Sequence, residues 1–375
     1  MARGKTTAAD PAELEKIEWP HAWPPPWRTK KFVGHELAER TMLASEQLGC
    51  LHHAWLITGP RGIGKATLAW RFARYLLTRQ QGLFAARPSS LDVASDAPGR
   101  ALVDARSHPD LFHLRRTLNP ETGRLRTEIV VDEVRELGTF MHMTPAMGQW
   151  RVAIIDSTDE MSRSAANAIL KILEEPPPNA VLLMVAHAAG RLLPTIRSRC
   201  RRLALHALPD ETIVDLLGEY APDIHSEERA DLARLAEGSI GRGLELASAG
   251  SLTLYREMVD VLATLPDLDM PRLHGFAERF GRRGEQANAD WRSLHLLFDG
   301  WLKGLARSGA SSTDAAPIVP AEGGLRRRLL AAASLDRWID AWEKVAHLLS
   351  RSDAVNLDRK QTVLVSFLAL QSAMR

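Results

Sequence analysis

Cysteine is almost absent from this chain of 375 residues, which contains only Cys50 and Cys200. Two cysteines so far apart in sequence cannot build a disulfide framework or a four-cysteine zinc site. We expect both to be small buried apolar residues and predict that no zinc binds. The 13 histidines show no H-E-x-x-H motif or other ligand spacing, so no metal site is predicted.

Long hydrophobic runs are also lacking. No apolar stretch approaches the roughly 20 residues that a membrane-spanning helix needs. The first 20 residues, MARGKTTAADPAELEKIEWP, are too polar to form the hydrophobic part of a secretory signal. We therefore expect a cytoplasmic protein with no membrane partner.

A strong excess of either charge is absent as well. The 48 basic and 46 acidic side chains give a net charge of +2, which argues against a wholly basic protein that coats nucleic acid. Nine of the 48 basic residues are lysines, leaving 39 arginines. This bias is explained either by recognition of phosphates and carboxylates through guanidinium groups or by arginine-favouring codon usage.

The length and the 45% of apolar residues are typical of a globular protein with two or three domains. Residues 1–31 lack periodicity, end in P-H-A-W-P-P-P-W, and are predicted to form a flexible tail. Trp19, Trp23 and Trp27 could anchor a partner or pack against the chain's own first domain.

Residues 32–206 alternate helical segments with short apolar runs, which is typical of an α/β fold with a parallel sheet covered by helices on both faces. Residues 80–107 have no clear period and are predicted to be a surface insertion. The expected helices cover 35–48, 65–79 and 162–175, and the expected strands cover 54–58, 110–114, 151–156 and 181–186.

Beyond residue 206 the pattern is helical throughout. Residues 207–250 are predicted to form a small all-helical domain, and residues 251–375 form a second helical block interrupted by a flexible polar loop at 307–324. The spacing of Trp291, Leu294 and Phe298 is typical of a buried helix face.

A phosphate-binding loop is the clearest motif. Residues 59–67 read G-P-R-G-I-G-K-A-T, which matches Gly-x-x-x-x-Gly-Lys between an expected strand and an expected helix. In such a loop the backbone N–H groups converge on phosphate oxygens and the lysine adds a positive charge. A plain strand-to-helix turn is the alternative. The predicted residues of a vestigial site for ATP or ADP are Gly59, Gly62, Gly64, Lys65, Thr67 and Asp156.

The groups that would hydrolyse a nucleotide are missing from this site. Ala66 follows the lysine, where a hydrolytic loop has a Ser or Thr that binds magnesium, and Thr67 is rotated by about 100° along the helix. Asp156 ends the strand at the place of the magnesium-organising carboxylate. Ser157 then stands where an activating glutamate follows in additional-strand NTPases, and a serine alone is no general base. Asp159 and Glu160 are predicted to cap the next helix instead.

Several longer stretches resemble the clamp-loader branch of the AAA+ family. They are S-A-A-N-A-I-L-K-I-L-E-E-P-P at 164–177, L-P-T-I-R-S-R-C at 193–200, L-H-H-A-W-L-I-T-G-P at 51–60, S-H-P-D-L-F at 107–112 and N-L-D-R-K-Q at 356–361. The resemblance is dense over residues 32–206 and weaker beyond. It implies an AAA+ P-loop domain, then a helical lid domain, then a C-terminal helical collar domain.

The resemblance also implies a role. The chain would be a noncatalytic stator in a hetero-pentameric, ATP-driven machine of the bacterial DNA polymerase III holoenzyme, which loads a ring-shaped sliding clamp onto primed DNA. Its partners would be the gamma/tau motor subunits and the clamp-opening delta subunit. Polymerase activity would belong to the holoenzyme, not to this chain.

Arg199, between Ser198 and Cys200, is implied to reach the ATP of a neighbouring subunit. A guanidinium at such an interface stabilises charge that develops on the transferred phosphoryl group. The alternative is that Arg199 belongs to a solvated basic edge or a DNA-facing strip with Arg197, Arg201 and Arg202. For the whole chain, the alternatives are an ATPase motor resembling gamma or tau and a direct DNA-binding protein.

The sequence also departs from the family pattern. The sensor threonine falls at Ala186 or His187, and the sensor arginine falls at Gly241, with Arg242 displaced by one place. The stretch 81–106 lacks the cysteines of the zinc module found in many members. We therefore predict that the pocket holds nucleotide but hardly turns it over.

Overall fold

The computed structural model describes residues 19, 21–79, 88–119, 125–310, 317–320 and 322–374. Its contacts divide the chain into two compact units, residues 1–208 and residues 209–375. The further boundary near residue 250 stays a prediction. Most of the predicted tail, residues 1–18 and 20, lies outside the described residues.

The first unit is built on a five-stranded sheet in which every strand pairs in parallel with its neighbours, in the order β2-β3-β4-β1-β5. This confirms the predicted parallel sheet. The strands are β1 (Ala54–Thr58), β2 (Leu111–Leu114), β3 (Arg151–Ile155), β4 (Ala180–Ala186) and β5 (Arg201–Ala204).

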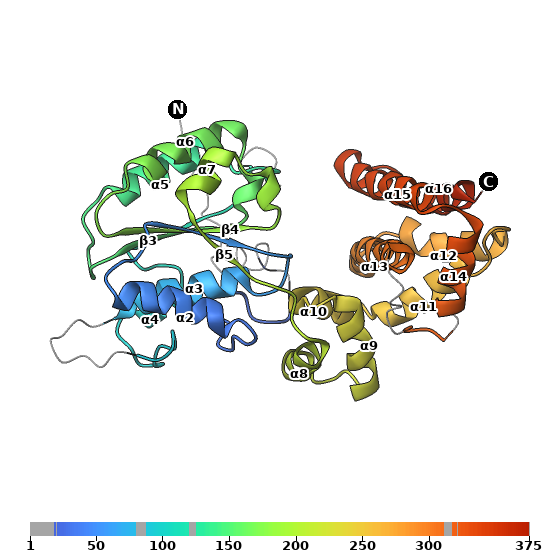
Figure 1. Cartoon of the computed structure of the whole chain (residues 1–375), viewed down its shortest axis with the longest axis horizontal. Coiled ribbons are helices and arrows are strands. Elements are labelled where there is room, and N and C mark those ends of the chain that lie inside the picture. The colour runs from blue at the N-terminus through green and yellow to red at the C-terminus, as the bar shows by residue number, and fades with distance from the viewer. Residues whose placement is uncertain are drawn as a thin grey trace, which may run out of the picture. The chain divides into compact units, whose positions relative to one another are not determined.

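Helices cover both faces of this sheet (Figure 1). One face carries α2 (Glu36–Gln47), α3 (Lys65–Thr78) and α4 (Arg100–Asp104), and the other carries α5 (Val131–Met141), α6 (Arg163–Glu174) and α7 (Pro194–Arg199). Successive side chains of a strand point to opposite faces. Accordingly, Trp55 and Ile57 pack in the core beneath α2 and α3, whereas Leu56 packs in the core beneath α5 and α6.

Strand β5 was not predicted. It is an edge strand with the sequence R-R-L-A, and three of its four residues are exposed. It therefore needs no apolar run and gives no hydrophobic signal. Its backbone pairs with β1 over Trp55 to Thr58, and the Arg201 guanidinium lies 4.7 Å from the centre of the Trp55 ring.

The N-terminal segment that precedes α2 packs on the first unit. Trp27 is only 3% exposed, and its ring lies 6.0 Å from that of Trp70 in α3. Arg74 Nη2 donates to the Trp27 carbonyl at 2.6 Å. Trp19 in turn lies 6.2 Å from Trp27, centre to centre. For these residues, packing against their own unit is therefore observed.

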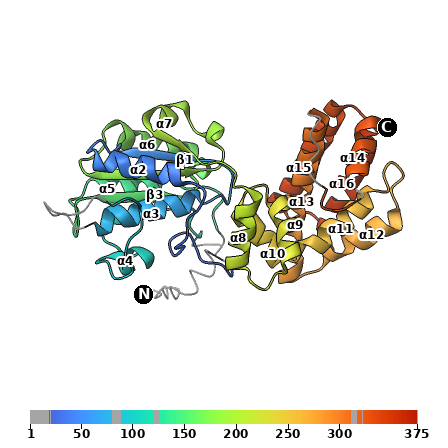
Figure 2. The ribbon, with the colours of Figure 1, turned by 60° about the horizontal axis from the view of Figure 1, so that its bottom comes forward.

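The second unit is helical throughout its described residues (Figure 2), and α15 and α16 pack side by side. Trp291, Leu294 and Phe298 are buried, as their spacing predicted. Helix α13 continues to Ala310, so the predicted loop begins later than residue 307. The helices are α8 (Asp210–Tyr220), α9 (Ser226–Ala236), α10 (Ile240–Ser248), α11 (Ser251–Leu262), α12 (Met270–Gly281), α13 (Glu285–Ala310), α14 (Glu322–Ala332), α15 (Leu335–Val355) and α16 (Arg359–Ala373).

A charged group is buried inside this helical unit. Glu322 is 1% exposed and accepts hydrogen bonds from the Tyr255 hydroxyl at 2.5 Å and from Arg326 Nη2 at 2.6 Å. Burial, together with the charge of Glu322, raises the pKa of Tyr255, so the phenol stays protonated and donates. The carboxylate thus joins α11 to α14.

The two cysteines differ in environment. Cys200 is buried as expected, and its Sγ lies 3.7 Å from Met184 Sδ. Cys50 is exposed, so the prediction that it is buried was wrong. It follows α2 in a turn next to Gly49, where no apolar pattern fixes the burial of a single residue. No described helix is both long and apolar enough to cross a membrane.

Candidate nucleotide and subunit-interface site

The loop between β1 and α3 has the backbone of a phosphate-binding turn. Its glycines all have positive φ angles, 142° at Gly59, 78° at Gly62 and 103° at Gly64, which L-residues rarely adopt. A Cβ atom at Gly59 would lie 2.4 Å from the carbonyl oxygen of Leu205. Glycine is therefore required at position 59 for space as well as for conformation.

Lys65 begins α3 and turns back over this loop. Its side chain is buried, and its Nζ donates to the carbonyls of Gly59 at 2.8 Å and Pro60 at 2.5 Å. Burial lowers the pKa of Lys65 to about 8, although the charges of Asp156 and Asp159 oppose the shift. A phosphate bound in the loop would compete with these two carbonyls for the ammonium group.

The segment just before α2 packs against the loop and forms a hydrogen bond with it. The Phe32 ring lies 3.1 Å from where a Cβ of Gly64 would stand. His35 Nε2 donates to the Ile63 carbonyl at 2.9 Å, and burial lowers the pKa of His35, which favours this neutral donor. Leu208 similarly fills the space beside Gly34. The segment before α2 and the segment after β5 thus both lie against the loop.

The structure brings Asp156 to the same place. It directly follows β3, and the charges that lower its pKa come from Lys65, Arg115 and Arg61. Burial outweighs these charges and raises the pKa of Asp156. Ala66 and Thr67 lie in the first turn of α3, and the Thr67 hydroxyl has no hydrogen bond to any described residue.

Ser157 directly follows Asp156, after the end of β3. It adopts φ of 68°, the left-handed region, and its Oγ is hydrogen-bonded to His187 Nε2 at 3.2 Å. Burial lowers the pKa of His187 to about 4, and the positive charge of Lys65 acts in the same direction. The imidazole is therefore neutral near pH 7.

Asp159 and Glu160 are both engaged in structural contacts. Asp159 accepts from the backbone N–H groups of His187 at 3.0 Å and Ala188 at 2.9 Å. Burial would raise its pKa, but these two donors outweigh burial, and the pKa of Asp159 is lowered. Glu160 forms an ion pair with Arg116 at 2.7 Å.

The prediction that these two acids cap the next helix was wrong. Ser162 is the N-cap of α6, and its hydroxyl accepts from the backbone N–H of Ala165 at 3.2 Å. Asp159 and Glu160 lie in the preceding short 3₁₀ turn, Thr158–Glu160. Asp159 binds the backbone that follows β4, and Glu160 pairs with Arg116, so neither acid starts the helix.

Arg242, in α10, also has its partners in its own unit. It forms an ion pair with Glu237 at 2.8 Å and donates to the Leu296 carbonyl of α13 at 2.9 Å. These contacts hold the side chain inside the helical unit.

Arg199 lies at the C-terminal end of α7 and is accessible. Its side chain is 36% exposed, forms an ion pair with Glu174 at 2.8 Å and donates to the Thr195 carbonyl at 3.1 Å. Neither partner belongs to the phosphate loop. Ser198 points its hydroxyl to the Thr195 carbonyl at 3.1 Å, whereas Cys200 anchors the end of the helix in the core.

Known proteins resemble this chain in the same region. The family model described as "DNA polymerase III, delta subunit" matches residues 35–209. DNA polymerase III subunit delta' of Pseudomonas aeruginosa is 36% identical over 50% of this chain and 53% of its own length. The subunit of that name from Escherichia coli is 34% identical over 59% of this chain and 62% of its own length.

Residues 35–209 are therefore similar to subunits of DNA polymerase III. A subunit named gamma from Buchnera aphidicola is also similar, at 30% identity over 67% of this chain and 66% of its own length. The matches to the two delta' proteins each span less than two thirds of those relatives. The similarity covers the α/β unit, whereas the role of the whole chain is a separate question.

Two contacts of the α/β unit were not predicted from the sequence: Ser157 with His187, and Asp159 with the backbone after β4. Both join the carboxyl ends of β3 and β4, which lie side by side in the sheet. These contacts could have been predicted only from the order of the strands, which makes β3 and β4 neighbours. Among the described residues, no three His, Cys, Asp or Glu side chains lie close enough together to hold a metal ion.

Proposed function

We propose that this protein is a noncatalytic clamp-loader subunit of the delta-prime type, a stator of the DNA polymerase III holoenzyme in the cytoplasm. The observation that carries the proposal is the state of the phosphate loop. The loop keeps its three glycines and Lys65, while Ala66 and Ser157 replace the residues that would bind magnesium and activate water. ATP or ADP would bind there without efficient hydrolysis.

The contacts around the loop favour this proposal over an active motor. A general base must reach the attacking water. Both carboxylate oxygens of Asp159 accept hydrogen bonds from backbone N–H groups, and Glu160 is paired with Arg116. His187, which with Ala186 is one of two candidates for the sensor position, has its pKa lowered to about 4 by burial and is hydrogen-bonded to Ser157.

The proposed task of Arg199 is to reach the nucleotide of a neighbouring gamma/tau subunit. Its guanidinium is accessible at the end of a short helix that Cys200 anchors in the core. The other partners would be the delta subunit and, through the hetero-pentamer, the sliding clamp and primed DNA.

Reconstitution with gamma/tau, delta, clamp and primed DNA tests this role. Arg199→Ala should leave assembly intact and reduce ATP hydrolysis at the neighbouring site by about 10³-fold, the lower end for such arginines. Arg202→Ala is the matched control, because Arg202 is an exposed arginine in the adjacent β5. Equal turnover of the wild-type and Arg199→Ala loaders would refute the interface role.

The second candidate is an ATPase motor, which the similarity to a gamma subunit favours. The purified chain alone distinguishes the two. A stator should show background ATP hydrolysis that Lys65→Ala does not change. A motor-like rate that Lys65→Ala abolishes would overturn the noncatalytic proposal.

A further inference from the structure

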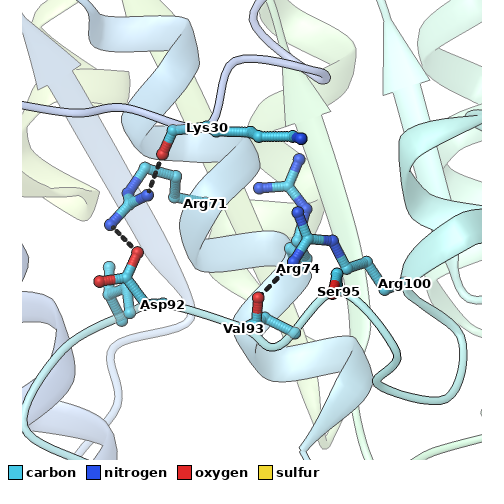
Figure 3. A pocket seen from close by; sticks show the side chains of 8 residues that line it. Lys30, Arg71, Arg74, Asp92, Val93, Ser95 and Arg100 are labelled. Atoms are coloured by element: carbon cyan, nitrogen blue, oxygen red, sulfur yellow. Dashed lines mark hydrogen bonds and ion pairs between the residues drawn. The ribbon is translucent and has the colours of Figure 1, made fainter.

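A second basic site lies in the first unit, away from the phosphate loop. A cavity of about 240 Å³ opens between the segment before α2, the middle of α3 and the segment that leads into α4. Its lining includes four cationic side chains and one carboxylate (Figure 3): Lys30, Arg71, Arg74, Arg100 and Asp92.

One of these cations is fully engaged in holding the fold. Arg71 forms ion pairs with Glu39 at 2.7 Å and Asp92 at 2.9 Å, and its Nη1 donates to the Lys30 carbonyl at 2.9 Å. Its charge is balanced by two carboxylates. Arg71 therefore shapes the cavity rather than offering a free donor.

Two of the other three cations, Arg74 and Arg100, share a single carboxylate, and Arg100 Nη1 also donates to the Val93 carbonyl. Asp104 pairs with Arg74 at 2.8 Å and with Arg100 at 3.4 Å. The Lys30 ammonium has no hydrogen bond or ion pair with any described residue. Figure 3 shows this ammonium and the guanidinium groups of Arg74 and Arg100 turned toward one another.

This arrangement leaves positive charge uncompensated in a partly buried place. Arg74 is 6% exposed, and burial lowers its pKa, with the charges of Arg100 and Arg71 acting in the same direction against Asp104. Its Nε and Nη2 are used by Asp104 and the Trp27 carbonyl, whereas no described residue accepts from Nη1. Like charges so placed repel each other until an anion enters.

We propose that this cavity binds one small phosphate-type oxyanion through Lys30, Arg74 and Arg100, with Ser95 as a further donor. Guanidinium and ammonium groups are the side chains that bind phosphate most strongly. The carboxylate of Asp92, 71% exposed at the lining, favours a single small ion over a polyanion such as nucleic acid, which it would repel. The phosphate loop contributes no residue to this site.

Isothermal titration calorimetry of the full-length protein with inorganic phosphate, at constant ionic strength, tests the proposal. Saturable binding with a millimolar or tighter Kd is expected. Repeating the titration with Lys65→Ala tests whether the phosphate binds at the phosphate loop instead. This variant should bind phosphate at the cavity as the wild type does. Absence of saturable binding would overturn the proposal.

Two variants with opposite expected effects make the test specific. Lys30→Gln should weaken binding about fivefold, the effect of one unit charge about 4 Å away in water. Asp92→Asn should tighten binding by a similar factor. Lys344→Gln, an exposed lysine of the helical unit, is the control and should change nothing. Equal affinity of wild type and Lys30→Gln would refute the site.

A competition distinguishes the two sources of a phosphate group. A single-stranded oligothymidylate, added at the same phosphate concentration, should fail to displace inorganic phosphate from the wild type. Displacement that Lys30→Gln abolishes would overturn the assignment to a small free ion and identify a contact with nucleic acid instead.

Discussion

At the scale of single residues, Asp159 has a structural task in the α/β unit. Its two carboxylate oxygens accept the N–H groups of His187 and Ala188, which would otherwise be unpaired at the end of β4. Hydrogen bonds to charged groups are among the stronger ones in proteins. The acid fixes the position of His187 relative to Ser157.

Removing this carboxylate should therefore weaken the fold. Asp159→Ala should lower the free energy of unfolding by about 3 kcal/mol, because two N–H groups lose a charged acceptor. Urea unfolding measures the change. Asp132→Ala removes an exposed acid whose one ion-pair partner among the described residues is Arg135, and it should cost less than about 1 kcal/mol. Equal losses for the two variants would contradict the structural task of Asp159.

His187 should make the fold sensitive to acid. Its pKa is about 4 in the folded protein against 6.5 when unperturbed, so between these values the unfolded chain binds more protons. The contribution of His187 to stability must therefore fall as the pH drops from 6.5 to 4. Urea unfolding of wild type and His187→Gln over this range should show a smaller loss for the variant. Parallel pH profiles would show that His187 does not titrate in this way.

At the scale of elements, the N-terminal segment is joined to α3 by side chains and backbone together. Trp27 contributes an indole buried against Trp70, while its carbonyl accepts from Arg74. The Arg106 guanidinium lies 4.3 Å from the centre of the Trp27 ring. The segment is thus an integral part of the α/β unit from residue 27 onward.

Trp27→Ala should destabilise this unit by roughly 3 to 5 kcal/mol, the usual cost of truncating a buried tryptophan. Chemical denaturation followed by circular dichroism measures it. Trp23→Ala is a suitable control, because Trp23 is only half-buried, and it should cost about 1 kcal/mol. If Trp27→Ala cost no more than the control, the indole would not belong to the core.

Elements with strong local signals were predictable from the sequence. The strand at 54–58 and the helix that begins at Lys65 were predicted because a buried apolar run meets a glycine turn. Strand β5 was missed because it is held by backbone pairing with β1 at an exposed edge. What makes these residues a strand is their place beside β1 in the folded sheet. The local sequence R-R-L-A does not reveal that place.

The candidate site was predictable in its composition but not in its contacts. The glycines, Lys65 and Asp156 follow from motif spacing, because the loop and the strand end are each local features. The bonds of Asp159 were not predictable, because they depend on β3 and β4 being neighbours. Glu174 could not be predicted as the partner of Arg199 either, because α6 and α7 meet only in the folded unit.

At the scale of the whole molecule, each of the two units has its own buried groups, and Glu322 is the most deeply buried acid of the helical one. Breaking a buried ion pair by removing one partner is strongly destabilising. Glu322→Gln leaves Arg326 without its carboxylate. It should lower the stability of the helical unit by about 3 kcal/mol.

Calorimetry of the full chain should resolve this effect from that of Trp27→Ala. Glu322→Gln should lower the transition of the helical unit, and Trp27→Ala that of the α/β unit, each leaving the other nearly unchanged. Arg327→Gln, an exposed change in the same helix as Glu322, is the control. A single transition lowered equally by both variants would show that the units unfold as one.

The closeness of Gly59 to Leu205 has a mechanical consequence. The backbone N–H of Leu205 donates to the Thr58 carbonyl at 2.8 Å, and three residues later the first unit ends at Leu208. The chain that continues into the helical unit therefore begins beside the phosphate loop. There is no room for a methyl group between Gly59 and the Leu205 carbonyl. A shift of the Gly59 backbone on phosphate binding would therefore press on Leu205, three residues before the first unit ends.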